Sequence, residues 1–236
     1  TKATVGQEFI KEFGRGIPEQ VGAPFPSRHM WLTAVVLDKD ENVYVADEWH
    51  NSIIVYNSDG DILTNWGEQG DGEGKLNRPS GMVFDADDNL WIVNSVNSRI
   101  QKFTKEGKYL ESFGKKGNGP DELDMPWGIT IDRQGDVFVA DWGNHRVQIY
   151  DACGQYITAL VGDAQEPSPW TQTYIDANPE YIKARRRADM EPEWRFHRPV
   201  AVNIDADDRI IVLESYRHRL QIYNKLKDYE EHSLNL

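Results

Sequence analysis

The sequence contains one cysteine, Cys153, and no long apolar run among its 236 residues. A single cysteine excludes an intrachain disulfide and a cysteine-based metal cluster. The longest uncharged apolar runs, at 129–131 and 210–213, are far shorter than the roughly 20 residues of a membrane-spanning helix. The first residues also lack the apolar core of a retained export signal. We therefore expect a soluble protein, either cytoplasmic or exported with its signal removed, with no membrane span.

Basic residues are in short supply. There are 26 Lys and Arg against 39 Asp and Glu, which gives a formal net charge of -13. Nucleic-acid binding needs clustered cations to displace counterions from the phosphates, so this balance disfavours it. A Gly-x-Ser-x-Gly nucleophile signature, a phosphate-binding Gly-rich loop and a compact metal triad are missing as well.

One segment is repeated four times along the chain. TAVVLDKDENVYVAD reappears as SGMVFDADDNLWIVN, WGITIDRQGDVFVAD and VAVNIDADDRIIVLE. The acids that align, Asp38, Asp85, Asp132 and Asp205, are separated by 47, 47 and 73 residues (85-38, 132-85 and 205-132). A fixed period of this length indicates a repeat architecture, and the third gap holds one repeat plus 26 extra residues (73-47).

Each repeat reads as four short strands joined by tight turns. A short β-branched strand ends at the aligned Asp, a turn rich in Asp, Asn and Gly follows, and three more strands complete the unit. Four antiparallel strands per 47 residues form a blade. Because an isolated blade cannot bury both of its faces, the pattern predicts an all-β fold in which blades stack around an axis as a β-propeller.

The repeats resemble NHL repeats, whose pattern runs Pro-x-Gly-Ile/Val, Asp, a turn, Val-x-Val-Ala-Asp and then Asn-His-Arg-Ile/Val-Gln. The third unit matches it almost throughout, from Pro126 and Gly128 to the run 144–148. The first unit departs most, because Leu32 replaces Pro and Ala34 replaces Gly. The resemblance implies an NHL-repeat β-propeller, a class whose members serve as enzymes, RNA binders, sensors and protein platforms.

The chain then reads as one domain, 1–236, with blades that start near 33, 80, 127 and 200. The fourth unit ends after its third strand, and the opening residues QEFIKEFG resemble a fourth strand when Phe9 and Phe13 are set on Tyr109 and Phe113. We predict that this N-terminal strand joins the last blade and closes a ring of four blades. The alternatives are a shortened relative of a six-bladed ring and a ring assembled from two chains.

A helical insertion is predicted over 163–198, between blades three and four. Ser168-Pro169 and Asn178-Pro179 each pair a helix N-cap with a proline at the first helical position. They predict helices over 169–177 and 179–189, with a possible short turn over 192–196. The run Arg185 to Arg187 makes the only dense basic stretch of the sequence.

The direction of the strands alternates within each blade. The connections between blades, the insertion and the loops between second and third strands therefore lie on one side of the propeller. This side gathers aromatic, basic and His residues, whereas the other side receives mainly short polar turns, so we expect the ligand site on the former. The candidate ligand-binding residues are Trp31, Trp49, His50, Arg78, Trp127, Trp142, His197, Arg198, Tyr216 and Arg217. His29 and His197 are candidate metal ligands, although His residues without fixed spacing are a weak metal signal.

Residues that recur in every blade have a structural interpretation. The aligned acids are expected to hold turns, and His145 and His218 occupy the His position of the repeat itself. Asp141 and Arg146 follow the repeat in the same way, so we expect them to bond the blade backbone or each other. Arg78 and Arg198 precede an entry proline and either clamp an anionic ligand or pair with neighbouring acids.

Two functions from different classes remain. The first is a scaffold without chemistry of its own that binds a protein, a peptide or a small anionic ligand. The second is a metal-assisted lyase or hydrolase acting on a small anionic or peptide-like substrate, with either no cofactor or a divalent metal ion. The second rests on a resemblance to peptide-amidating lyases, which place metal-binding His beside the blade-entry proline, where this chain has Ser80, Trp127 and Val200. If catalysis exists, His29, His197, Arg78 and Arg198 are the residues to test.

Overall fold

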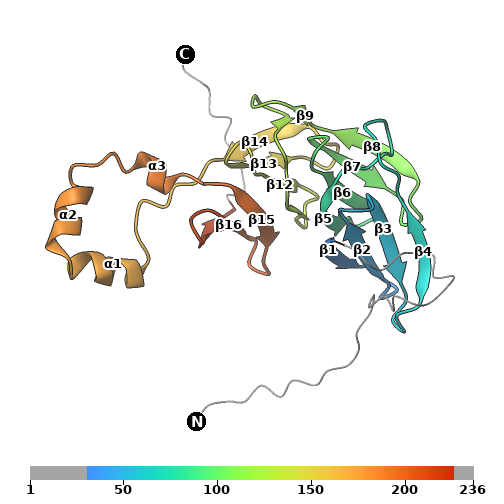
Figure 1. Ribbon diagram of the computed structural model, residues 1–236, viewed down its shortest axis with the longest axis horizontal. Helices are drawn as coiled ribbons and strands as arrows, with labels where there is room; N and C mark the ends of the chain where they lie inside the picture. The colour runs from blue at the N-terminus through green and yellow to red at the C-terminus, as the bar shows by residue number, and fades with distance from the viewer. Residues whose placement is uncertain (1–30, 226–236) are drawn as a thin grey trace, which may run out of the picture.

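A computed structural model describes residues 31–225 and confirms the predicted β-propeller of four blades. Figure 1 shows the sheets following one another in chain order, from blade 1 in blue to blade 4 in orange and red. The predicted closing strand lies outside the described residues. The strands are β1 Leu32–Leu37, β2 Val43–Asp47, β3 Ser52–Tyr56 and β4 Ile62–Trp66 in blade 1; β5 Pro79–Phe84, β6 Leu90–Asn94, β7 Arg99–Phe103 and β8 Tyr109–Phe113 in blade 2; β11 Ile129–Ile131, β12 Val137–Asp141, β13 Arg146–Tyr150 and β14 Tyr156–Leu160 in blade 3; and β15 Pro199–Ile204, β16 Arg209–Glu214 and β17 Arg219–Asn224 in blade 4.

Neighbouring strands within each blade pair antiparallel, in the order of the sequence. Between blades 2 and 3, the short strands β9 Lys115–Lys116 and β10 Glu122–Leu123 form a two-stranded parallel ladder. Within residues 31–225, no helix is long and apolar enough to span a bilayer.

The aligned acids form the first turn of each blade, as predicted. In blade 3, one carboxylate oxygen of Asp132 accepts hydrogen bonds from the amides of Gln134 and Asp136, both at 2.9 Å. Asp85 makes the same pair of bonds in blade 2, at 3.0 and 2.9 Å. A carboxylate that accepts from the backbone two and four residues ahead stabilises the turn, so these acids are structural.

The core lies between blades rather than within them. Tyr44 and Ile53 of blade 1 pack with Leu90 of blade 2 in one buried cluster, and equivalent clusters fill the spaces between blades 2 and 3 and between blades 3 and 4. Each inner face therefore removes its apolar side chains from water against the next blade.

The glycine of the Pro-x-Gly motif permits the innermost strands to approach closely. A Cβ atom at Gly81 would lie 2.6 Å from the carbonyl oxygen of Trp127 in blade 3. At Gly128 it would lie 2.8 Å from the carbonyl oxygen of Val200 in blade 4. Carbon and oxygen cannot approach this closely, so a side chain at either position would push two blades apart.

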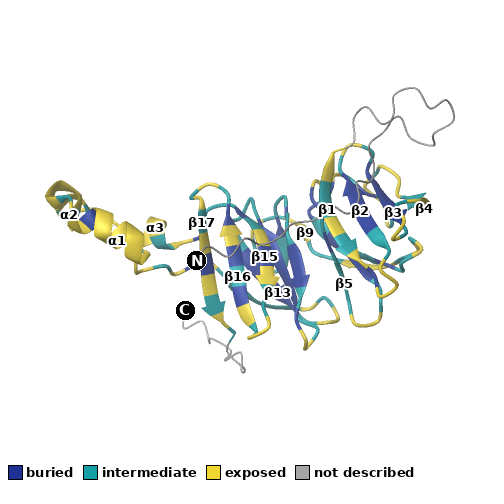
Figure 2. Cartoon of the chain, turned by 90° about the horizontal axis from the view of Figure 1, so that it is seen from below, coloured by how far each residue is buried: buried dark blue, intermediate teal, exposed yellow. Residues whose placement is uncertain are grey.

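The insertion is helical, as predicted, with α1 Pro169–Asp176, α2 Pro179–Arg185 and α3 Glu191–Trp194. Ser168 caps α1, because its side-chain oxygen accepts from the amide of Thr171 at 3.3 Å. Figures 1 and 2 show α1 and α2 extending away from the blades instead of covering them. The insertion is therefore a projecting arm, and Trp170 on α1 is exposed.

The base of this arm is fixed to blade 4. Phe196 is buried among the apolar residues between blades 3 and 4. The guanidinium of Arg217 donates to the backbone carbonyls of Arg195, at 2.8 Å, and of Pro192 and Glu193. Arg219 also donates to the Arg195 carbonyl, at 2.7 Å. Cationic donors on the carbonyls at the end of α3 satisfy groups that the helix leaves unpaired.

Candidate functional site

The loops between second and third strands and the entries into blades 2, 3 and 4 form one side of the propeller, here called the loop face. A buried polar side chain at the end of each second strand organises it. Asn94, Asp141 and Glu214 accept hydrogen bonds from the backbone amides of Asn77, Asp124 and His197, at 2.8, 2.8 and 2.7 Å. These side chains bond the blade backbone, which agrees with the structural interpretation of Asp141.

A second repeated contact fixes the residue before each entry proline. Arg78, Met125 and Arg198 have φ values of 55°, 46° and 56°, in the left-handed region that L-residues seldom adopt. Their amides donate to a side chain of the preceding blade: Asn51 Oδ1 at 2.7 Å, Ser98 Oγ at 3.4 Å and His145 Nδ1 at 3.1 Å. The contact holds the pre-proline residue at an equivalent place in each of these blades.

His145 is consequently an acceptor through Nδ1, so its neutral form carries the proton on Nε2. Burial lowers the pKa of His145 below its usual value of 6.5, and the charges of His197, Arg198 and Arg217 lower it further, against the opposing charge of Asp141. This is the direction expected for an imidazole that is desolvated near cations. His145 therefore serves the fold by receiving the Arg198 amide.

Five side chains of the loop face lie together at the junction of blades 3 and 4, and we call them the Arg198 cluster: Trp142, His145, His197, Arg198 and Tyr216. The Arg198 guanidinium carbon lies 4.2 Å from the centre of the Trp142 ring and 4.8 Å from that of Tyr216. The His197 ring lies 4.7 Å from His145 and 4.9 Å from Tyr216. Two aromatic rings thus hold a cation at the junction of blades 3 and 4.

Arg198 makes no ion pair among residues 31–225. A guanidinium with rings against it still presents the N–H groups along its edge, which match the two oxygens of a carboxylate or phosphate. Among residues 31–225, no acidic side chain would have to be displaced from Arg198 for the cluster to receive an anionic group.

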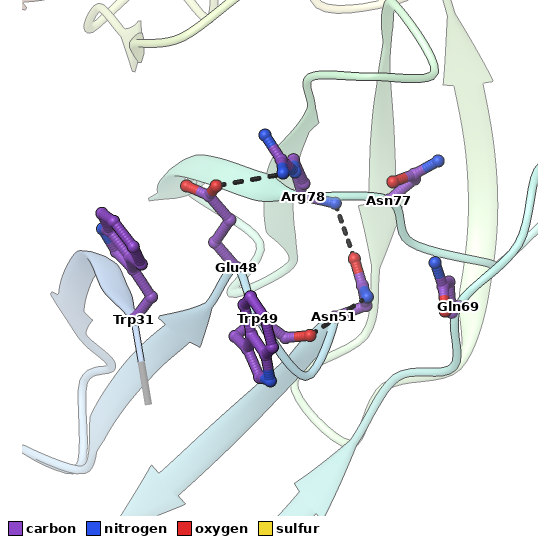
Figure 3. A pocket seen from close by; sticks show the side chains of 7 residues that line it. All are labelled: Trp31, Glu48, Trp49, Asn51, Gln69, Asn77 and Arg78. Carbon is purple, nitrogen blue, oxygen red and sulfur yellow. Dashed lines mark hydrogen bonds and ion pairs between the residues drawn. The ribbon is translucent and has the colours of Figure 1, made fainter. Parts of the chain in front are cut away.

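A second group of side chains surrounds a cavity of about 190 Å³ at the junction of blades 1 and 2, here called the Trp pocket. Figure 3 shows Trp31 and Trp49 on one side and Asn77 and Gln69 on the other. Arg78 lies at this pocket and pairs with Glu48, at 3.7 Å between Nε and Oε1. Unlike Arg198, this arginine has an acidic neighbour.

The remaining candidates lie elsewhere. His50 bonds to Asp47, at 2.7 Å from Nδ1 to Oδ2. Trp127 is half-buried, and its carbonyl accepts from Ser80 Oγ at 2.8 Å. Arg217 anchors the insertion, as described above. His29 lies outside the described residues, so its pairing with His197 at a metal cannot be placed. Within the described chain, no three His, Cys, Asp or Glu side chains are grouped so as to hold a metal ion.

The structure therefore brings most, but not all, of the sequence candidates together in two places. Trp31, Trp49 and Arg78 line the Trp pocket, while Trp142, His197, Arg198 and Tyr216 belong to the Arg198 cluster. Sequence reasoning missed the polar lining of the pocket, Glu48, Asn51, Gln69 and Asn77. A signal for two of them was present, because Glu48 and Asn51 lie in the same loop as Trp49 and His50.

Antiparallel blades that follow one another in repeat order, three of them four-stranded and one with three described strands, define a β-propeller. The NHL repeat family matches residues 76–103 and 123–150, which hold most of blades 2 and 3. These two matches and the arrangement of the blades support an NHL-repeat β-propeller.

Solved structures agree with this fold. A streptogramin B lyase is 15% identical, with a TM-score of 0.54, and the match covers 87% of this chain and 58% of that one. Virginiamycin B lyase of Staphylococcus aureus, solved with quinupristin, is 14% identical, with a TM-score of 0.54 and coverage of 86% and 59%. A protein of unknown function from Bacteroides thetaiotaomicron is 19% identical, with a TM-score of 0.58 and coverage of 82% and 47%.

This chain thus spans less than two thirds of these structures, and identities this low show the fold alone. No curated protein sequence is significantly similar to it.

Proposed function

We propose that this NHL propeller is a binding scaffold whose loop face receives a carboxylate-bearing peptide, protein segment or small molecule at the Arg198 cluster. The observation that carries the proposal is the arginine held against Trp142 and Tyr216 without an acidic partner among the described residues. A preorganised guanidinium loses less side-chain entropy when it binds an oxyanion than a flexible one does.

The local charge supports an anionic ligand even though the whole chain is acidic. Arg198 and Arg217 lie close enough to His145 for their charges to lower its pKa. A confined group of cations in a protein of net charge -13 attracts an anion to one place on its surface. A nucleic acid would instead meet a surface of predominantly negative charge.

The metal-assisted lyase or hydrolase considered above rests on resemblance alone. The lyases among the similar structures are 14–15% identical to this chain, which carries no statement about substrate or reaction. The scaffold needs no step beyond recognition of an anion.

The proposal is tested with a synthetic peptide that carries a free C-terminal carboxylate and with the same peptide amidated. Binding is followed through the indole N–H signal of Trp142 in NMR spectra, assigned with the Trp142→Phe variant. We expect the free acid to shift this signal and the amide to leave it unchanged. Citrate and inorganic phosphate, titrated separately, distinguish a carboxylate site from a general anion site.

Two substitutions provide the matched comparison. Arg198→Ala should weaken binding of the free acid by at least about tenfold, because a charge-assisted hydrogen bond contributes roughly 1.5–3 kcal/mol. Arg78→Ala, at the equivalent position of blade 2, should leave the affinity unchanged. Equal losses from the two variants, or equal binding of acid and amide, would refute the assignment to Arg198.

A further inference from the structure

The Trp pocket and the Arg198 cluster occupy equivalent places on the loop face, each at a junction between two described blades. Arg78 and Arg198 both precede an entry proline and have nearly the same φ, 55° and 56°. Each guanidinium faces the residue that directly follows the second strand of the preceding blade. In the Arg198 cluster this residue is Trp142, whereas in the Trp pocket it is Glu48. The repeat thus builds one arrangement twice and gives the arginine a different neighbour each time.

The walls of the Trp pocket are held in place by the blades. The amide of Trp31 donates to Asp47 Oδ1 at 3.2 Å, and its carbonyl accepts from the Glu48 amide at 2.9 Å. Gln69 forms an isolated parallel bridge with the fully buried Leu76. The pocket therefore belongs to the junction of blades 1 and 2, and its walls are fixed before a ligand enters.

The two charged side chains of the pocket balance each other. Arg78 Nε lies 3.7 Å from Oε1 of the half-buried Glu48. An anion in the pocket would meet the carboxylate and a cation would meet the guanidinium, so either would compete with an existing ion pair. The pocket consequently favours an uncharged ligand, unlike the Arg198 cluster.

The pocket also offers hydrogen-bonding groups that the described residues leave unused. The side-chain amides of Gln69 and Asn77 line it and make no hydrogen bond within residues 31–225. Each of these amides carries both donors and an acceptor, while Glu48 adds acceptors and Arg78 adds donors. Planar polar groups of both kinds thus surround a cavity of about 190 Å³.

Two indole rings supply the apolar part of the pocket. Trp31 and Trp49 lie on the opposite side of the cavity from Asn77 and Gln69 (Figure 3). A pyranose has apolar C–H groups on its faces and hydroxyls around its edge, each of which donates and accepts. Such a ring can pack a face on an indole while its hydroxyls bond the planar groups opposite. The cavity is smaller than the roughly 300–1,000 Å³ of pockets for drug-sized ligands, which suits a single ring.

We propose that the Trp pocket binds one uncharged sugar ring, which packs on the indoles and receives hydrogen bonds from Asn77 and Arg78 while donating to Glu48. This site is separate from the Arg198 cluster, so the inference does not rest on the proposed function. The loop face then carries two sites of different chemistry, one for a carboxylate and one for a neutral sugar.

The test follows the indole N–H signals of Trp31 and Trp49 in NMR spectra of the full 236-residue protein, assigned with the Trp31→Phe and Trp49→Phe variants. Methyl glucoside, methyl galactoside, methyl mannoside and N-acetylglucosamine are titrated separately. We expect at least one of them to shift both signals with a dissociation constant on the order of 1 mM, the affinity that the usual efficiency per atom gives a single ring. The signal of Trp170, an exposed tryptophan on the arm, is the internal control and should not move.

Three variants separate the contributions to this site. Asn77→Ala should weaken sugar binding by about three- to tenfold, the effect of losing a neutral hydrogen bond. Arg198→Ala should leave the sugar affinity unchanged. Glu48→Gln keeps a planar acceptor but removes the charge that opposes anions, so it should change the sugar affinity by less than about threefold. In this variant sodium acetate should shift both pocket signals, which it should not do in the unaltered protein.

Several outcomes would overturn the proposal. One is the absence of a shift with any of these sugars, and another is a shift of the Trp170 signal equal to that of the pocket signals. Stronger shifts with choline than with the sugars would indicate an aromatic site for cations instead. Acetate binding in the pocket of the unaltered protein would contradict the argument from charge. The Trp142 signal reports the Arg198 cluster separately, so a failure there leaves these results distinguishable.

Discussion

Replacing Asp141 by Ala should destabilise the propeller more than any loss at an exposed acid. The Asp141 carboxylate is fully buried, and it accepts hydrogen bonds from the Asp124 amide at 2.8 Å, Arg146 Nε at 2.9 Å, Asn144 Nδ2 at 2.9 Å and Gln148 Nε2 at 3.2 Å. Its removal leaves the largely buried Arg146 guanidinium without its acidic partner.

Removing one member of a buried ion pair costs roughly 3–5 kcal/mol. The Arg146 guanidinium keeps bonds to the carbonyls of Gly119, at 2.8 Å, Asn118, at 3.1 Å, and Glu122. The loss should therefore lie near the lower end, at about 3 kcal/mol. Asp141→Asn retains an acceptor for the Asp124 amide, as Asn94 does for Asn77 in blade 2, and should cost about 1–2 kcal/mol.

Urea unfolding followed by tryptophan fluorescence measures the effect. With a slope of about 2 kcal/mol per molar urea, a loss of 3 kcal/mol lowers the midpoint by about 1.5 M. The exposed Asp87→Ala is the matched control and should change stability by less than about 0.5 kcal/mol. A loss below 1 kcal/mol in Asp141→Ala would refute the view that this carboxylate organises the loop face.

Three further changes test other parts of the structure. The pKa of His145 in the folded protein is lowered from 6.5, so the stability that the neutral imidazole contributes is complete above pH 6.5 and is lost as the pH falls from 6.5 toward the folded pKa. His145→Asn places at this position the residue type that Asn51 has in blade 1 and should make the melting temperature less dependent on pH in this range. Gly128→Ala should cost about 1–3 kcal/mol in urea unfolding, since its Cβ would meet the next blade, and an unchanged midpoint would contradict the close approach. Replacing Trp170 and Tyr174 together by Ala should leave the melting temperature of the blades within a few degrees, because both side chains lie on the exposed arm; a loss of about 3 kcal/mol would show that the arm is part of the core.

The repeat made the fold accessible to sequence reasoning. The spacing of the repeats, the Asp residue of the first turn and the apolar alternation of the strands recur from unit to unit. The blades, and the role of Asp132 in holding its turn, therefore follow from local chemistry alone. The helices of the insertion were also predictable, because Ser168-Pro169 and Asn178-Pro179 are local signals. Their direction was not, since it depends on where Arg217 and Phe196 fix the base of the arm.

The candidate site was predictable only as a face. Parity placed Trp142, Arg198 and Tyr216 on the same side, but their stacking depends on distances between blades that no local pattern contains. The difference between Arg78 and Arg198 was equally hidden. Both precede an entry proline, yet one faces Glu48 and the other faces two rings.

The hydrogen bond that holds each pre-proline amide has a bearing on how such proteins diversify. The backbone at Arg78, Met125 and Arg198 is fixed by a side chain of the neighbouring blade and not by the residue's own side chain. Replacing the side chain of one of these residues changes the chemical groups that a ligand meets, while the path of the backbone stays the same. New binding specificities can therefore evolve one blade at a time, by single substitutions at these three positions.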